Sequence, residues 1–409
     1  MFQTKINTFF STLNIVLVFI GYQLITSLLS LFMLEAEASR LVTVPYRAFA
    51  LLVCLVTIFL NYKSKFKLNV VVKVLLVYWL LLLIRFFYDM YFRADVYVFN
   101  DKKLQTLLYM IPMTFIPMYS VMKSYKVIDF KKLLTWIYVL FSITIVFSYF
   151  SNELFQENVF QRIDANMALN TISTGHLGLS SIILSIYLLL NRKQILFKKL
   201  LIIFILILGM IIMLRAGSRG PILSLLAVMS IWILALSNRK ILNASILIIL
   251  SLLVYFFIDY IFQFIEYISP VLEARLNRGQ EEQIAGRNSL YIYAWETFLQ
   301  NPFIGKNFAI YWGDGTMIYS HNFILDSFMQ LGILGGLMII FIIWKTIIKI
   351  IDLIKVKSFY FWIGLILVQE IMAIMVSGSF YYSPIVSILI VLLFLPLDRD
   401  NYSLQKLQN

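Results

Sequence analysis

The sequence has little charge, one cysteine and two histidines, and each of these shortages excludes a class of protein. Charged residues make up 13% of the 409 positions and hydrophobic residues 61%, with a mean hydropathy of +0.87, which excludes a soluble globular domain. Cys54 is the single cysteine, so a disulfide framework, a thiolate metal cluster and a redox pair are excluded. The two histidines, His176 and His321, are too far apart in sequence to supply a metal cluster. We expect no metal and no cofactor.

Long apolar runs replace the missing charge, and each is long enough to cross a hydrocarbon layer about 30 Å thick. They predict an all-α, polytopic membrane bundle of about twelve helices, which we treat as one integral membrane domain over residues 1–409. The expected spans are 10–34, 45–61, 68–91, 104–122, 133–150, 169–190, 200–214, 221–237, 241–264, 321–344, 359–378 and 383–397. The first run is too long for the apolar region of a signal peptide, so we expect it to remain as a helix.

Lysine and arginine gather in alternate connections between these runs, as at Lys63, Lys65 and Lys67, whereas acids are scarce there. This positive-inside pattern predicts that both termini are cytoplasmic. The net charge of +13 would suggest nucleic acid in a soluble protein, but topology accounts for it here, and we expect no nucleic-acid partner. One long connection, residues 265–320, falls on the outer face. Within it, residues 286–300 predict a short amphipathic helix whose apolar face is formed by Leu290, Ala294, Trp295, Phe298 and Leu299.

Arginines near the outer face form the first candidate site. Arg215, Ser218 and Arg219 lie in a short connection with Gly217, Gly220 and Pro221, where glycines allow close backbone approach and a helix begins. Cations at membrane depth need an anionic partner or a water-filled cavity, so the segment has the outline of a phosphate site. The alternative is a tight hairpin whose arginines extend to lipid headgroups. Arg287 opens the amphipathic helix and could add a bidentate contact, whereas for Arg275 and Arg278 we favour pairing with loop acids.

His321 is the candidate base, because imidazole titrates near neutral pH and a helix N-terminus would disfavour its charged form. Asn322 follows it, and Asp326 could orient the site or pair with an arginine. A lone histidine at a helix start is more often a cap or an interfacial residue. For the other ionisable groups at membrane depth we expect structural or relay roles. Arg85 and Asp89 should pair with each other, and His176 should pack among small residues. Glu370 should be a proton-relay residue or part of an ion pair inside the bundle.

Three motifs in this order resemble those of the O-antigen ligase and O-antigen polymerase superfamily. They are Ser218-Arg219-Gly220 before an apolar helix, the 287–295 helix followed by Asn301-Pro302-Phe303-Ile304-Gly305, and His321-Asn322 followed by Gly332 and Gly335. The resemblance covers residues 200–340. It implies a metal-independent membrane glycosyltransferase of the bacterial inner membrane, with its active site facing the periplasm and an undecaprenyl-diphosphate-linked glycan as donor.

By position, the resemblance implies that Arg215 or Arg219 and Arg287 bind the diphosphate, while His321 deprotonates the acceptor hydroxyl; Asn322, Asp326 and Ser218 would support them. The sequence shows no Walker motif and no dinucleotide fingerprint, so no nucleotide-sugar site is expected. The partners would be the lipid-linked donor, a glycan acceptor, membrane lipids and a regulator of chain length.

Three functions remain open. A polymerase extends a surface polysaccharide such as O-antigen by joining lipid-linked repeat units, whereas a ligase transfers the glycan to the lipid A core of lipopolysaccharide. We favour the polymerase, because the outer loops show no feature dedicated to a large glycolipid. A flippase for lipid-linked sugars should show internal repeats and charges at the bilayer midplane, and the candidate residues lie instead near the outer edge.

Overall fold

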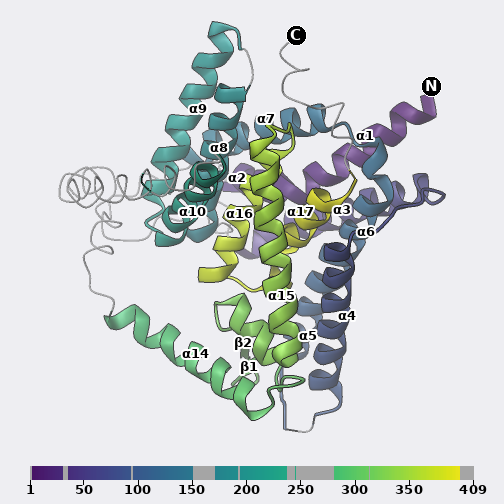
Figure 1. The fold of residues 1–409 in the computed structure, drawn as a ribbon, viewed down its shortest axis with the longest axis vertical. Coiled ribbons are helices and arrows are strands. Elements are labelled where there is room, and N and C mark those ends of the chain that lie inside the picture. Colours follow the sequence, from purple (N-terminus) through teal and green to yellow (C-terminus); the bar gives the residue numbers. More distant parts are fainter. Residues whose placement is uncertain are drawn as a thin grey trace.

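The computed structural model describes residues 2–30, 36–93, 95–150, 171–191, 194–236, 245, 281–312 and 314–396. Within these residues the chain forms a helical bundle with one small hairpin of strands (Figure 1). Eight helices are long and apolar enough to cross a membrane, and three shorter apolar helices accompany them. The predicted all-α membrane class is therefore confirmed.

The first half contains α1 (Phe2–Val16), η1 (Leu17–Gly21), α2 (Tyr22–Ser30), α3 (Ala36–Leu60), α4 (Val70–Tyr91), α5 (Asn100–Met110), η2 (Ile111–Phe115), α6 (Ile116–Ser124), η3 (Tyr125–Val127) and α7 (Phe130–Phe150). The second half contains α8 (Thr171–Asn191), α9 (Leu196–Arg215), α10 (Arg219–Leu236), α14 (Glu281–Gln300), β1 (Ile310–Tyr311), β2 (Met317–Ile318), α15 (Phe323–Lys355), α16 (Phe361–Val376), η5 (Phe380–Tyr382) and α17 (Pro384–Phe394).

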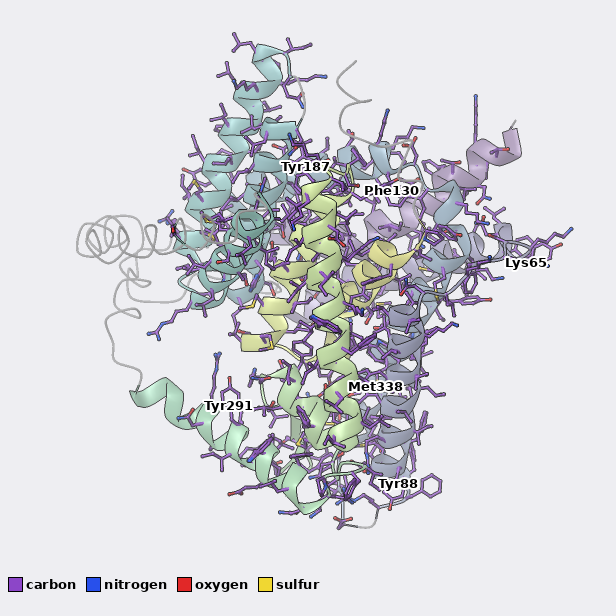
Figure 2. The ribbon with its side chains drawn as sticks, in the orientation of Figure 1. Lys65, Tyr88, Phe130, Tyr187, Tyr291 and Met338 are labelled. Atoms are coloured by element: carbon purple, nitrogen blue, oxygen red, sulfur yellow. The ribbon has the colours of Figure 1, made fainter. Side chains whose placement is uncertain are left out.

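The two ends of the bundle can be followed along α15, the long helix in the middle of the view. Figure 2 shows Tyr187 and Phe130 toward one end, Tyr88 toward the other, and Met338 of α15 between them. The strands β1 and β2 and the helix α14 lie at the end where α15 begins (Figure 1). We call this the His321 end of the bundle, because His321 comes two residues before α15.

The expected spans coincide with helices, except that 241–264 lies outside the described residues apart from Ser245. Several predicted boundaries differ from the observed ones: α1 begins at Phe2 and α3 at Ala36, where we expected helices to start at residues 10 and 45. We expected the helix after His321 to end at residue 344, but α15 continues to Lys355. Its last turns keep Ile350, Leu353 and Ile354 buried at helical spacing, so the helix remains amphipathic beyond the apolar run.

The most buried helices are α8, α16 and α17, which the others surround. Leu365, Ile366 and Leu367 are consecutive residues of α16 and all are buried, as expected for a helix covered on every side. The backbones of α8 and α9 are close to each other: a Cβ added at Gly178 would lie only 2.6 Å from the Gly209 carbonyl oxygen. The predicted packing of small residues around His176 is confirmed.

A break in α15 fixes the connection that follows α14. Gly332 has φ 66° and ψ −157°, so the helical ladder is interrupted there. The Ile333 N–H donates to the Pro302 carbonyl oxygen at 2.7 Å, and the Lys306 N–H donates to the Met329 carbonyl oxygen at 2.9 Å. A regular helix would have joined Ile333 to Met329. The connection after α14 therefore supplies a new acceptor for the Ile333 N–H and a new donor for the Met329 carbonyl oxygen. The Asn301–Gly305 and Gly332 motifs thus have a structural role.

The predicted pair of Arg85 and Asp89 on α4 is confirmed, and it belongs to a larger network. The Asp89 carboxylate lies 3.6 Å from a guanidinium nitrogen of Arg85 and 3.6 Å from one of Arg93. It also accepts hydrogen bonds from the Phe308 N–H at 2.6 Å and the Tyr311 hydroxyl at 2.7 Å. This buried carboxylate thus joins α4 to the strand β1 at the His321 end.

Candidate active site

His321 lies in a tight turn between β2 and α15, in a left-handed backbone conformation with φ 64°. Such a conformation is costly for a residue other than glycine and persists only where neighbours impose it. Asn322 supplies one constraint, because its side-chain oxygen accepts hydrogen bonds from the Ile324 and Leu325 N–H groups and so caps α15. Asn322 therefore positions the turn.

Asp326 supplies the second constraint on the turn. Its carboxylate is buried and accepts a hydrogen bond from the Ser320 N–H at 2.9 Å. The Ser320 hydroxyl donates to the Asn322 carbonyl oxygen at 3.0 Å and accepts from the Asn322 N–H at 3.2 Å. Of the two roles considered for Asp326, the contacts support orientation of the turn. His321 is thus flanked by two residues whose backbones are both fixed.

Three groups surround the His321 imidazole. The Tyr319 ring lies 4.6 Å from it, centroid to centroid, in an edge-to-face arrangement. The backbone of Ser377, just after α16, and the Arg287 guanidinium are both close enough to act on the imidazole electrostatically. Burial and the Arg287 charge lower the pKa of His321 below 6.5, while the Ser377 backbone opposes them. The neutral form that we expected is favoured, although burial is its main cause.

Arg287 reaches this site from α14, whose boundaries differ from the prediction. The helix begins at Glu281, so Arg287 lies in its second turn and does not open it. Ala294 is buried with Ile310 and Met329, and Leu290 packs against them. Trp295 and Leu299 of the predicted apolar face are 46% and 57% exposed, so only part of this face packs on the bundle. These exposed side chains suit a helix at a membrane interface.

The segment containing Arg215, Ser218 and Arg219 connects α9 to α10. Arg215 is the last residue of α9, Arg219 is the first of α10, and Ser218 between them is buried. A Cβ added at Gly220 would lie 3.5 Å from His176 Nε2 and 3.6 Å from Val376 Cγ2. Val376 immediately precedes Ser377, whose backbone acts on the His321 imidazole. The end of α16 therefore lies between the arginine segment and the imidazole.

The structure thus places the Arg287 charge within electrostatic range of His321, and Val376 and Ser377 lie between His321 and the Arg219 segment. Arg275 and Arg278 lie outside the described residues. Sequence reasoning did not place Tyr319 or Ser377 beside the imidazole, which they approach from separate elements. Among the described residues, no group of three His, Cys, Asp or Glu side chains could hold a metal ion. The roles of the arginines and of His321 remain predictions.

The region that contains this site matches a known protein family. Residues 203–340 match the family model described as O-antigen ligase. The match includes Arg215, Ser218, Arg219, Arg287, His321, Asn322 and Asp326. No curated protein matches the chain. The resemblance to the O-antigen ligase and polymerase superfamily, whose members are membrane enzymes that transfer glycans, is confirmed over this region.

Proposed function

Because residues 203–340 match the family model described as O-antigen ligase, we propose that this protein is an integral-membrane glycosyltransferase. It would polymerise undecaprenyl-diphosphate-linked oligosaccharide repeat units. The His321 end of the bundle would face the periplasm of the bacterial inner membrane, with both termini cytoplasmic. The observation that supports the proposal best is the half-buried imidazole of His321, held by its turn beside the Arg287 guanidinium.

In this reaction His321 takes the proton from an acceptor hydroxyl, and the resulting oxygen attacks the anomeric carbon of the donor sugar. The bond from that carbon to the lipid diphosphate breaks, and the diphosphate leaves with its electron pair. Arg287, together with Arg215 or Arg219, stabilises the charge that develops on the leaving group. Fixed guanidinium groups suit this task because they form bidentate contacts with phosphate oxygens. The reaction needs one base and a cationic pocket.

The test uses purified protein in liposomes with lipid-linked repeat units as the sole glycan. We expect long chains from the wild type, and a loss of at least a hundredfold for His321→Ala and Arg287→Ala, in line with removal of a general base or of a charge-stabilising donor. Asn288→Ala changes the exposed residue next to Arg287 and serves as the control. Elongation at the wild-type rate in both site variants would exclude the transferase and favour transport of the lipid-linked sugar.

A ligase is the second candidate, because the matching family model is described by that activity. The same liposomes distinguish the two when lipid A core is added or withheld. Chain growth without core supports the polymerase. Transfer that begins only when core is supplied, with no growth before, supports the ligase.

A further inference from the structure

A second polar site lies beside the candidate active site, in a cavity that no step proposed so far uses. The cavity encloses about 320 Å³, within the size range of small-ligand sites. Its walls come from η1, α2, α3, η2, α16 and the start of α17. Its polar lining includes Tyr22, Gln23, Arg47, Tyr109, Glu370 and Tyr382. Two of the walls, η1 and η2, are π-helical turns, a distortion frequent at functional sites.

Arg47 and Glu370 both face this cavity but do not form an ion pair with each other. The Arg47 guanidinium lies over the rings of Tyr22 and Tyr109, 5.0 and 5.7 Å from their centroids. The ion pairs among the described residues do not include it. The Glu370 carboxylate accepts a hydrogen bond of 3.4 Å from its neighbour Gln369. Each side chain thus presents unused hydrogen-bonding capacity to the same space.

Charged groups at membrane depth are costly unless water or a polar ligand solvates them. The ligand that fits here must accept hydrogen bonds from a guanidinium and donate them to a carboxylate. A sugar hydroxyl does both, and tyrosine rings offer flat apolar surfaces with polar edges on which a sugar ring can lie. Because the guanidinium of Arg47 shares the cavity with the carboxyl group of Glu370, the cavity suits a ligand that both accepts and donates hydrogen bonds, as a polyol does, better than a phosphate. The chemistry of the lining therefore favours a saccharide.

The cavity is joined to His321 by a chain of aromatic contacts. Tyr109 packs against Tyr382 at 5.1 Å, Tyr382 against Tyr319 at 6.1 Å, and Tyr319 against His321 at 4.6 Å, all between ring centroids. Arg287 and Ser377 approach the imidazole as separate contacts. The imidazole thus has two sets of neighbours. Arg287 and Ser377 lie on the side of the candidate arginines, whereas Tyr319 connects it through Tyr382 to the cavity.

We propose that the cavity between α2, α3, η2 and α16 binds a sugar ring of the acceptor glycan, with Arg47 and Glu370 as its hydrogen-bonding partners. This inference rests on the proposed function, because it assigns the acceptor to the side of His321 opposite the donor diphosphate. Arg47 donates to sugar oxygens, Glu370 accepts from sugar hydroxyls, and Tyr382 separates the bound ring from Tyr319.

Binding of a free saccharide tests this without requiring transfer. The probe is the repeat-unit oligosaccharide released from its lipid by mild acid, titrated calorimetrically into the full-length protein in detergent. Wild type should bind it, and Arg47→Gln and Glu370→Gln should each weaken binding by about tenfold or more, as for loss of a hydrogen bond to a charged group. Arg287→Gln should bind as wild type does.

Lys345→Gln is the matched control, because Lys345 also lies over an aromatic ring, 4.7 Å from the Trp344 centroid, and does not line the cavity. If Arg47→Gln unfolds, Arg47→Lys keeps the charge and loses the planar fork, and it should still weaken binding. The proposal is overturned if wild type does not bind the oligosaccharide, if the cavity variants bind it normally, or if Arg287→Gln loses binding equally. Failure of the proposed function would appear separately, as absence of polymer from lipid-linked repeats.

Discussion

The guanidinium of Arg85 donates a hydrogen bond of 3.0 Å to the carbonyl oxygen of Gln330, which is 245 positions away in sequence. The same group donates to the carbonyl oxygens of Ile304 and Gly305 at 2.6 and 2.9 Å. One side chain of α4 therefore fastens both the broken part of α15 and the connection after α14. These two segments form the support of the turn that contains His321.

Arg85→Ala should destabilise the His321 end of the bundle. It leaves backbone carbonyls without donors and removes one of the two cations beside Asp89, at an expected cost of about 3 kcal/mol. The single cysteine offers a direct measurement, because Cys54 has no exposed surface and a thiol-reactive dye modifies it faster as the protein unfolds. Lys73→Ala, at an exposed position of α4, is the control. Equal melting temperatures for the two variants would contradict this role of Arg85.

Gly332→Ala should be more damaging than Gly336→Ala, although only four residues separate them. At Gly332 an added Cβ would lie 2.5 Å from the Phe303 carbonyl group, and φ is positive, so strain of about 1–3 kcal/mol adds to a clash with backbone. At Gly336 the Cβ meets the ring of Phe328, a side chain that can rotate. Melting temperatures measured with the same dye should follow this order. The reverse order would show that the break in α15 is not required.

Asp326→Ala should slow transfer with little change in donor affinity. The change leaves the Ser320 N–H without its carboxylate acceptor, at a cost of about 1–3 kcal/mol, and frees the turn that precedes His321. Asp326→Asn retains an acceptor oxygen and should recover most of the rate. Steady-state kinetics on lipid-linked repeats separate kcat from KM. A direct contact between Asp326 and substrate would instead raise KM in both variants.

The pH profile of transfer should report the charge beside His321. A base must be neutral, so the rate rises with pH through the pKa of His321 and is flat above it; because that pKa is lowered, the rise lies below pH 6.5. Arg287→Gln removes one cause of the lowering and should move the rise to higher pH, even though the maximal rate is smaller. Asn288→Ala should leave its position unchanged. A rise at the same pH in Arg287→Gln would show that the two groups do not interact.

The helices were predictable because apolar runs of membrane-spanning length have few alternative structures. The pairing of Arg85 with Asp89 also followed from helical spacing, whereas their contacts with Ile304, Phe308 and Tyr311 did not, because these join segments more than two hundred residues apart. The position of Tyr319 against His321 could not be read because it depends on the left-handed turn at His321, and that of Ser377 because it lies on a separate helix end. The start of α14 was placed late because Glu281 and Glu282 resemble loop residues by composition, yet acids are favourable in a first helical turn.

The interruption at Gly332 divides α15 into a short segment next to His321 and a long one that spans the bundle. The short segment is fastened to α4 twice, by Arg85 at Gln330 and by the Tyr78 hydroxyl, which lies 2.8 Å from the Ser327 hydroxyl. A change in bilayer thickness alters the tilt of a spanning helix. In this protein the long segment of α15 can tilt at Gly332, while the short segment is held by its bonds to Arg85 and Tyr78. The geometry around the imidazole should therefore be insulated from the lipid composition of the host membrane.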